Sequence, residues 1–244
     1  MKHNATQLSL FAAALALVAG CAYNSANACG KCAGHNAVAE QADNRSNRDD
    51  AEGFTTILGK DHTDGWTLND DWMKIEDGIL IAGSYGKNEG KKVPKTMYAV
   101  HDKTYYNFEL RADIKVVGPE KSNAGFQIRS SYDEEKATMA GYQADVGEKY
   151  WGRLYDQSRG RGLLGQYEEG IDLAKDINWN EWNSYVVRCE GPRIRIWING
   201  KLFTDYTEKT EKFIGVKGRL GLQLHWGPPS VRYHRNIRIK ELDD

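Results

Sequence analysis

The chain has 244 residues, with 33 Lys and Arg, 34 Asp and Glu, and a net charge of −1. This balance argues against nucleic acid, or an anionic membrane surface, as a partner. The content of 7 Trp, 13 Tyr and 25 Gly with only 5 Pro is typical of a β-rich domain with many tight turns. It equally suits a surface on which aromatic rings stack against sugars, and composition alone leaves both explanations open.

The N-terminus has the pattern of a targeting segment. Lys2 and His3 precede an apolar run from Leu8 to Val18, which is too short to span a bilayer and fits the core of a signal peptide. The run ends in VAGC, which resembles the bacterial lipobox and closes on Cys21. The pattern predicts a lipoprotein signal peptide over residues 1–20 and a lipid on Cys21; the alternative is an ordinary signal peptide followed by a chance cysteine.

The predicted location follows from this anchor. Ala22 is not the Asp that retains a lipoprotein at the inner membrane, so the outer membrane is favoured. We expect an exported bacterial lipoprotein, in the periplasm or at the cell surface, that contacts the membrane through its N-terminal lipid only.

Residues 21–52 show little hydrophobic periodicity and are predicted to form a flexible, lipidated tether. Cys29 and Cys32 form CGKC, with His35 three residues further on. Metal binding, redox activity and c-type haem are alternatives, but the haem motif needs His directly after the second Cys. A disulfide in an exported tether, or no role, is favoured. Cys189, on the apolar side of a predicted strand, is expected to be an inert buried thiol.

Strand patterns dominate the folded domain, predicted over residues 53–244. Residues 108–116 alternate apolar and polar side chains with a strict period of two, which indicates a half-buried strand. Asn199–Gly200 predicts a hairpin turn, because both central positions of a type I′ turn need positive φ. Residues 134–140 are the one modest helical candidate. The expected fold is all-β, with two packed antiparallel sheets.

Three predicted strands carry a Gln followed two residues later by an ionisable group on the side away from the core. Side chains two apart share one face of a strand, so each pair points the same way. The pairs are Gln127 with Arg129, Gln143 with Asp145, and Gln223 with His225. If the three strands are neighbours, they form a polar floor with a cation, a carboxylate and an imidazole. The alternative for each pair alone is an ordinary solvated strand face.

Residues 150–170 lie between the second and third of these strands in the chain. They contain Trp151, Tyr155, Asp156 and Arg159 among glycines, which suits a rim or lid over the polar floor. A long hairpin with locally packed aromatics is the alternative, and Asp156 with Arg159 could be a surface ion pair of little energetic value. Four other tryptophans are assigned to packing, without a function: Trp66, Trp72, Trp179 and Trp182.

An ordered set of motifs resembles the 3-keto-disaccharide hydrolase domain family, described as 3-keto-glucoside 1,2-lyase / 3-keto-2-hydroxy-glucal hydratase. The motifs, in order, are GFTTILGKDHTDGW, WMKIEDGIL, NFELRADIKV, SNAGFQIRS, GYQADVG, YWGRLYDQSR, EWNSYVVRCEGPRIRIWINGK, GRLGLQLHWG and RNIRIKEL. The resemblance covers residues 53–242. It implies a concanavalin-like jelly-roll sandwich in an exported bacterial protein that acts on 3-keto-glucosides or other glycans.

The implied reaction needs a base for the acidic C2 proton, an electrophile for the enolate oxygen and a general acid for the departing O1. His225 is expected to be the base and Arg129 to stabilise the enolate oxygen. Asp145 is expected to orient His225, replace it, or bind a metal. The remaining site residues are predicted to bind the sugar: Gln127, Gln143, Gln223, Trp151, Tyr155, Asp156 and Arg159.

No cofactor is certain from the sequence. A divalent metal at Asp145 and His225 stays open, although the spacing forms no compact metal motif. A non-catalytic, lectin-like carbohydrate-binding module on a lipid anchor is the main alternative function, because jelly rolls serve both purposes. A surface interaction domain without sugar chemistry is the third.

Overall fold

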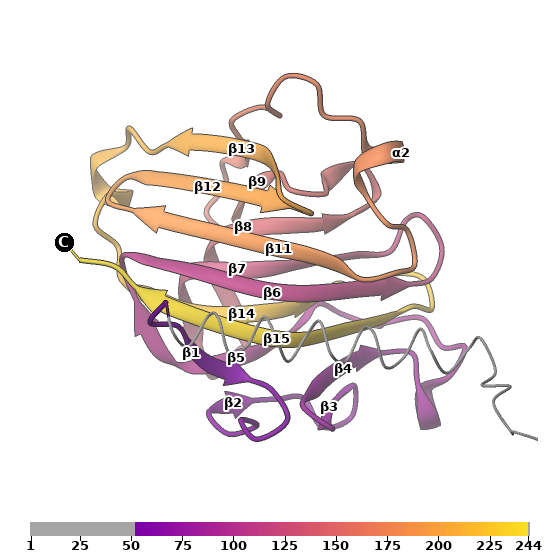
Figure 1. The fold of residues 1–244 in the computed structure, drawn as a ribbon. Coiled ribbons are helices and arrows are strands. Elements are labelled where there is room, and N and C mark those ends of the chain that lie inside the picture. The colour runs from indigo at the N-terminus through magenta and orange to yellow at the C-terminus, as the bar shows by residue number, and fades with distance from the viewer. Residues whose placement is uncertain (1–51, 244) are drawn as a thin grey trace, which may run out of the picture. The chain divides into compact units, whose positions relative to one another are not determined.

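The computed structural model describes residues 52–243, which form two antiparallel sheets packed face to face (Figure 1). The predictions for the signal peptide, Cys21, Cys29 and Cys32 lie outside the described residues. No helix among the described residues has the length and apolar character that crossing a bilayer requires.

The first sheet has eight strands in the order β13-β12-β11-β6-β15-β4-β3, and β1 also pairs with β15. It faces the viewer in Figure 1, with β13 at the top and β3 near the bottom. Its strands are β1 (Thr55–Leu58), β3 (Met73–Glu76), β4 (Ile79–Gly83), β6 (Phe108–Val117), β11 (Asn183–Glu190), β12 (Arg193–Ile198), β13 (Lys201–Thr207) and β15 (Val231–Glu241).

The second sheet has seven strands in the order β10-β9-β8-β7-β14-β5-β2 and lies behind the first in the same view (Figure 1). Its strands are β2 (Trp66–Thr67), β5 (Met97–Tyr105), β7 (Asn123–Asp133), β8 (Thr138–Gly147), β9 (Leu154–Gln157), β10 (Gly162–Leu164) and β14 (Gly218–Leu224).

Helical structure in the described residues is limited to single turns. These are α2 (Leu173–Asp176) and the 3-10 turns η1 (Gly86–Asn88), η2 (Glu148–Tyr150) and η3 (Glu211–Phe213). The helix considered for residues 134–140 is absent: that segment forms the turn between β7 and β8 and the start of β8. Its Thr and Met continue the strand, and the turn before them ends on Ala137 with φ 50°.

The core lies between the two sheets and is built from the apolar positions of alternating strands. Phe126 of β7 packs against Tyr185 of β11, with ring centroids 5.1 Å apart. Cys189 is fully buried on the same inner face of β11 as Tyr185, and burial raises the pKa of its thiol to about 12. The prediction of an inert buried thiol at this position is therefore confirmed.

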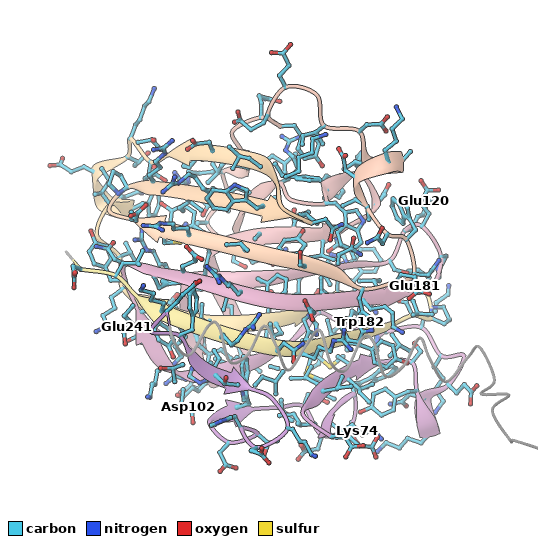
Figure 2. All side chains as sticks on the ribbon, in the orientation of Figure 1. Lys74, Asp102, Glu120, Glu181, Trp182 and Glu241 are labelled. Atoms are coloured by element: carbon cyan, nitrogen blue, oxygen red, sulfur yellow. The ribbon has the colours of Figure 1, made fainter. Side chains whose placement is uncertain are left out.

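The hairpin between β12 and β13 turns at the predicted dipeptide. Asn199 and Gly200 adopt φ values of 51° and 83°, as the sequence pattern requires. The outer face of the first sheet is half-exposed: Trp182 and Tyr233 meet there at 6.4 Å, and Trp182 is labelled in Figure 2.

Candidate functional site

The three predicted polar strands are neighbours in the second sheet, in the order β8-β7-β14. Gln127 lies opposite Gln143, and Gly125 lies between Asp145 on one side and Gln223 on the other. The polar floor predicted from the sequence therefore exists for these three glutamines and Asp145. Their side chains are almost entirely buried, with exposed fractions of 1% to 5%, so they are no ordinary solvated strand face.

The glutamines form a directed hydrogen-bond chain that ends on Asp145. Ser130 donates to Oε1 of Gln127 at 2.9 Å, and Gln127 donates to Oε1 of Gln143. Gln223 also donates to Oε1 of Gln143, at 2.8 Å, and Gln143 donates from Nε2 to Oδ1 of Asp145 at 2.5 Å. Gln143 Nε2 also donates to Oε1 of Gln223, at 3.4 Å, so the amide oxygens of all three glutamines accept, and the shorter of the two hydrogen bonds from Gln143 goes to the carboxylate.

A glycine makes room for this chain. A Cβ added at Gly125 would lie 2.6 Å from the side chain of Gln143, which is closer than real Cβ contacts allow. The Gln143 amide therefore lies flat across β7 because its neighbour has no side chain.

The main chain of Asp145 is held by three partners. Its N–H donates to the carbonyl of Arg153 at 2.8 Å, and its carbonyl accepts from the N–H of Gly152 at 2.9 Å and from the Tyr185 hydroxyl at 2.6 Å. Burial raises the pKa of the Asp145 carboxyl to about 7, although the Gln143 hydrogen bond and the charge of Arg153 oppose the shift. The carboxyl is thus poised to exchange a proton near neutral pH.

His225 follows β14 directly and lines the same cavity as Asp145. Its Nδ1 lies 2.7 Å from the carbonyl oxygen of Trp226, which can only accept, so Nδ1 carries the proton and Nε2 is the basic nitrogen of the neutral ring. Burial lowers the pKa of His225; the Trp226 carbonyl opposes this and the charge of Arg232 adds to it. The imidazole is therefore held neutral.

Arg232 is a buried cation behind this cavity. The side chain is fully buried, and it donates to the carbonyl of Asn123 from Nε and Nη2, at 3.2 and 2.7 Å. Its Nη1 donates to the carbonyl and hydroxyl of Ser230. Burial lowers the pKa of its guanidinium to about 10. No carboxylate among the described residues pairs with it, so its charge acts on neighbours such as His225.

The cavity that joins these groups has a volume of about 410 Å³. Asp145 and His225 stand on strands separated by β7, roughly 10 Å apart at the usual strand spacing, which leaves room for a sugar ring between them. The cavity is lined by Thr96, Asn123, Gln143, Asp145, Tyr150, Tyr155, Gln157, Leu163, His225 and Trp226.

Arg129 does not lie in this cavity, and the prediction that it shares a face with Gln127 is wrong. The register of β7 shifts between Ile128 and Ser131, and Arg129 adopts φ 47°. This bulge turns the side chain to one end of the sandwich. There it donates to the carbonyls of Tyr106 and Gly191, both at 2.6 Å, and to Asn107 Oδ1 at 3.1 Å.

Trp151 offers no stacking surface either. It is 2% exposed and packs against Tyr185 and Trp179, at 6.4 and 6.0 Å between centroids. It lies directly after η2 in the connection from β8 to β9, so strand alternation could not predict that it enters the core.

Asp156 and Arg159 form a buried ion-pair network away from the cavity. Asp156 alternates with Tyr155 on β9, so Tyr155 and Gln157 face the cavity while Asp156 faces inward. Its carboxylate pairs with Arg159 at 2.5 Å and Arg161 at 2.6 Å. The alternative of a surface ion pair does not hold, since Asp156 is buried, and the sugar-binding role expected for both residues has no support from their positions.

Sequence reasoning missed several lining residues. Trp226 is 61% exposed and stacks on His225 with 5.4 Å between ring centroids. The signal was present, because an exposed-turn motif, HWGPP, follows the third polar strand. Asn123 and Thr96 carried no such signal: Asn123 enters the cavity as the first residue of β7, and the Thr96 hydroxyl accepts there from the N–H of Trp226 at 3.4 Å.

A metal site is not assembled in the part of the chain that the structure describes. No group of three or more His, Cys, Asp or Glu side chains lies close enough there to hold an ion. Asp145 and His225 are the two ionisable groups of these types in the cavity lining.

The structure is a jelly-roll sandwich with a buried polar floor and an open cavity. Together with the match of the sequence to a carbohydrate-active family, this makes it a carbohydrate-active domain. The chain belongs to the family of the 3-keto-alpha-glucoside-1,2-lyase-like domain, whose model matches residues 53–240. The resemblance found in the sequence is thereby confirmed. No curated protein matches the chain.

Solved structures show the same fold. A candidate glycosyl hydrolase from Parabacteroides distasonis ATCC 8503 is similar with a TM-score of 0.57 and 21% identity, over 80% of this chain and 97% of that one. A second from the same organism has a TM-score of 0.53 and 20% identity, over 78% and 99%. The β-glucanase of Bacillus licheniformis has a TM-score of 0.50 and 12% identity, over 78% and 99%. These likenesses confirm the predicted jelly-roll fold.

Proposed function

We propose that this domain cleaves 3-keto-glucosides by elimination across C1 and C2, hydrates the resulting 3-keto-2-hydroxy-glucal, or does both. Family membership over residues 53–240 supports the substrate class. The observation that carries the proposal is the pairing of Asp145 and His225 in one cavity, with the pKa of the carboxyl raised and that of the imidazole lowered. Displacement of two pKa values in opposite directions is typical of an acid and a base.

The proposed reaction is redox-neutral. The C3 ketone acidifies the C2 proton; the base takes that proton, and its electron pair forms the enolate. The C1–O1 bond then breaks, and the departing O1 receives a proton from the acid, which gives the 3-keto-2-hydroxy-glucal and the free aglycone. Addition of water across the C1–C2 double bond puts OH on C1 and H on C2. The sum is hydrolysis of the glycoside.

In this proposal, Nε2 of His225 removes the C2 proton, and the protonated carboxyl of Asp145 supplies the proton to O1. The hydrogen bond of Nδ1 to Trp226 fixes the tautomer of the base. The Gln143 amide fixes the carboxyl. Since Arg129 lies elsewhere, the enolate oxygen is assigned to neutral donors of the lining, the Asn123 amide and the Tyr155 hydroxyl.

A divalent metal stays an open part of the proposal rather than a step in it. The described residues supply two ionisable ligands in the cavity and no larger group, so no proton transfer is routed through an ion. An assay with and without EDTA tests this directly.

The alternative function is a non-catalytic carbohydrate-binding module. The exposed ring of Trp226 at the cavity mouth favours it, because an aromatic platform over polar amides would bind a sugar without any chemistry. In that case His225 and Asp145 would only hydrogen-bond the ligand.

Export and lipidation are proposals that rest on the sequence pattern of residues 1–22. We propose a lipoprotein anchored by Cys21 in the outer membrane, in the periplasm or at the surface. Metabolic labelling with an alkyne fatty acid should mark the wild-type chain and not Cys21→Ala. Equal labelling of both would rule out Cys21 as the anchor.

The function is tested by mixing the purified chain with 3-keto-trehalose, with and without EDTA. Enone absorbance reports elimination, and released glucose together with 3-keto-glucose reports net hydrolysis. Formation of either product supports the enzyme. Saturable glycan binding without either product would replace it with the binding module.

A further inference from the structure

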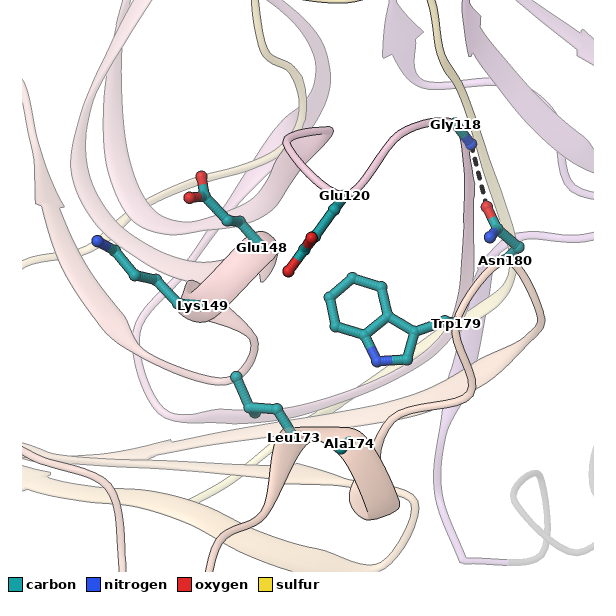
Figure 3. Close-up of a pocket in the computed structure, with 8 residues that line it drawn as sticks. All are labelled: Gly118, Glu120, Glu148, Lys149, Leu173, Ala174, Trp179 and Asn180. Atoms are coloured by element: carbon teal, nitrogen blue, oxygen red, sulfur yellow. Dashed lines mark hydrogen bonds between the residues drawn. The ribbon is translucent and has the colours of Figure 1, made fainter.

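A second cavity, of about 630 Å³, lies beside the candidate site and belongs to none of the functions assigned above. Figure 3 shows the indole of Trp179, the Glu120 carboxylate and Leu173 around one opening. The lining comes from four separate segments of the chain: Gly118 and Glu120; Glu148 and Lys149; Leu173 and Ala174; Trp179 and Asn180.

Trp179 gives this cavity an aromatic wall. Its side chain is 37% exposed, unusual for the largest apolar side chain, although the sequence assigned it to packing. Trp151 supports it edge-on, with 6.0 Å between centroids and 78° between ring planes. Trp151 in turn is buried against Tyr185. The indole is thus held in one orientation from the core side and left open toward the cavity.

The wall beside Trp179 is fixed as well. Oδ1 of Asn180 accepts from the N–H of Gly118 at 3.1 Å, which joins two segments 62 residues apart (Figure 3). Asn180 adopts φ 59°, and Gly118 adopts φ 153° where an added Cβ would lie 2.5 Å from Cβ of Ser230. These restraints make the opening a built cavity and not a gap between loose loops.

The polar groups of the cavity suit a hydroxyl-rich neutral ligand. Glu120 and Glu148 offer acceptors, and Lys149 offers a donor. Neither carboxylate takes part in an ion pair among residues 52–243. Two unpaired carboxylates disfavour an anion, while an aromatic face next to them suits a sugar ring, which presents C–H groups on one side and hydroxyls at its edge.

The turn η2 connects this second cavity to the first. Glu148 and Lys149 line the second cavity, and the next residue, Tyr150, lines the first. The Tyr167 hydroxyl donates to the carbonyl of Lys149 at 2.8 Å and holds the turn. At its start Gly147 (φ 107°) packs so closely that a Cβ would lie 2.1 Å from the carbonyl oxygen of Ser122. One rigid turn therefore separates the two cavities.

We propose that the second cavity is a binding subsite for the neighbouring sugar unit of a glycoside whose 3-keto unit occupies the first cavity. The neighbouring ring stacks on Trp179, and its hydroxyls bind Glu120 and Glu148. The inference rests on the proposed function for the identity of the reacting unit. It makes the substrate a disaccharide or longer glycan and not a glucoside of a small alcohol.

The kinetic test compares 3-keto-trehalose and 3-keto-cellobiose with methyl 3-keto-α-glucoside, using the full chain. Trp179→Ala should raise KM for the disaccharides about tenfold, the usual loss for a stacked aromatic anchor, and leave the methyl glycoside unchanged. Trp179→Phe should recover part of the loss. Trp182→Ala is the matched control, since that ring lies on the outer face of the other sheet (Figure 2). Equal effects of Trp179→Ala on all three substrates would overturn the subsite.

A binding readout separates this proposal from the catalytic one. The indole N–H resonance of Trp179, assigned by its loss in Trp179→Ala, is followed during titration with trehalose, cellobiose and the two 3-keto disaccharides. A saturable shift of the Trp179 resonance with a disaccharide supports the subsite, even if no 3-keto-glucoside is turned over. A resonance that no disaccharide shifts overturns the subsite, even in a chain that is fully active.

Discussion

Gln143 donates its amide hydrogen to Oδ1 of Asp145 at 2.5 Å, while its own amide oxygen accepts from both Gln127 and Gln223. Two donors on one amide oxygen polarise the amide, and this strengthens its hydrogen bond to the carboxyl. The carboxyl is therefore fixed in place by a buried network, although burial holds its pKa near 7. A group that is rigid and half-ionised at neutral pH is suited to proton transfer.

The pH dependence of turnover follows from the two displaced pKa values. Activity needs a neutral His225, whose pKa lies below its usual 6.5, and a protonated Asp145, whose pKa is about 7. We expect kcat/KM to rise through the lower value and to fall as the pH passes about 7, with an optimum on the mildly acidic side. A pH series on 3-keto-trehalose checks this. Activity that rises through pH 7 to a plateau would instead make the Asp145 carboxylate the base.

Asp145 should also make the fold less stable at alkaline pH. Its pKa rises from 3.8 in the unfolded chain to about 7 in the folded one, so the folded state binds the extra proton. Its contribution to the free energy of unfolding is full below 3.8 and is lost progressively as the pH rises through about 7. At pH 8, Asp145→Asn should raise the free energy of unfolding by up to a few kcal/mol relative to wild type, and the Tm with it. Near pH 4 both quantities should change little. Thermal melts of both proteins across this range measure the effect; parallel curves would contradict it.

Arg129 is expected to stabilise the fold without a role in turnover. Replacing it with Ala removes hydrogen bonds to Tyr106, Asn107 and Gly191 and leaves a void where the fully buried Arg129 side chain stood. The expected cost is about 2–4 kcal/mol of unfolding free energy. Urea unfolding measures the stability, and kcat per folded molecule, measured well below the melting temperature, should stay within about twofold of wild type. A large fall in kcat in the folded variant would restore the catalytic role that the sequence suggested.

The Asp156 network is expected to behave in the same way. Asp156 pairs with Arg161, which also pairs with Glu208 at 2.9 Å, and the Tyr142 hydroxyl donates to Glu208 at 2.7 Å. Burial alone would raise the pKa of Glu208, but these hydrogen bonds lower it to about 2. Asp156→Asn should cost about 2–4 kcal/mol in unfolding free energy, because Arg159 and Arg161 lose the buried carboxylate that they share. Urea unfolding and KM for 3-keto-trehalose are the readouts, and a selective rise in KM would contradict the structural role.

The sequence predicted those parts of the fold that follow from local periodicity. The alternation over residues 108–116 and the Asn199–Gly200 turn each became the expected element, β6 and the β12–β13 hairpin. The grouping of the glutamines was also predictable, since it needs only alternation and the adjacency of three strands. The family resemblance supplied the jelly-roll topology, which periodicity alone does not determine.

The errors have physical causes that a single sequence hides. A bulge at Arg129 breaks alternation without a glycine or proline to mark it, so the side chain leaves the predicted face. Trp151 is buried because η2 redirects the chain. Trp179 is partly exposed because Trp151, against which it packs, occupies the core position. Asp156 is different: strict alternation with Tyr155 already places it on the inner face of β9, and that signal was available.

The central claim is that Asp145 and His225 act together on a 3-keto-glucoside. The direct measurement is kcat/KM for 3-keto-trehalose in wild type, His225→Ala and Asp145→Asn, with Arg129→Ala as the buried-residue control and folding of each variant checked by circular dichroism. We predict a loss of at least about 100-fold in each of the two site variants and little change in the control. Folded site variants that keep wild-type turnover, or lose only affinity for the sugar, would contradict the account.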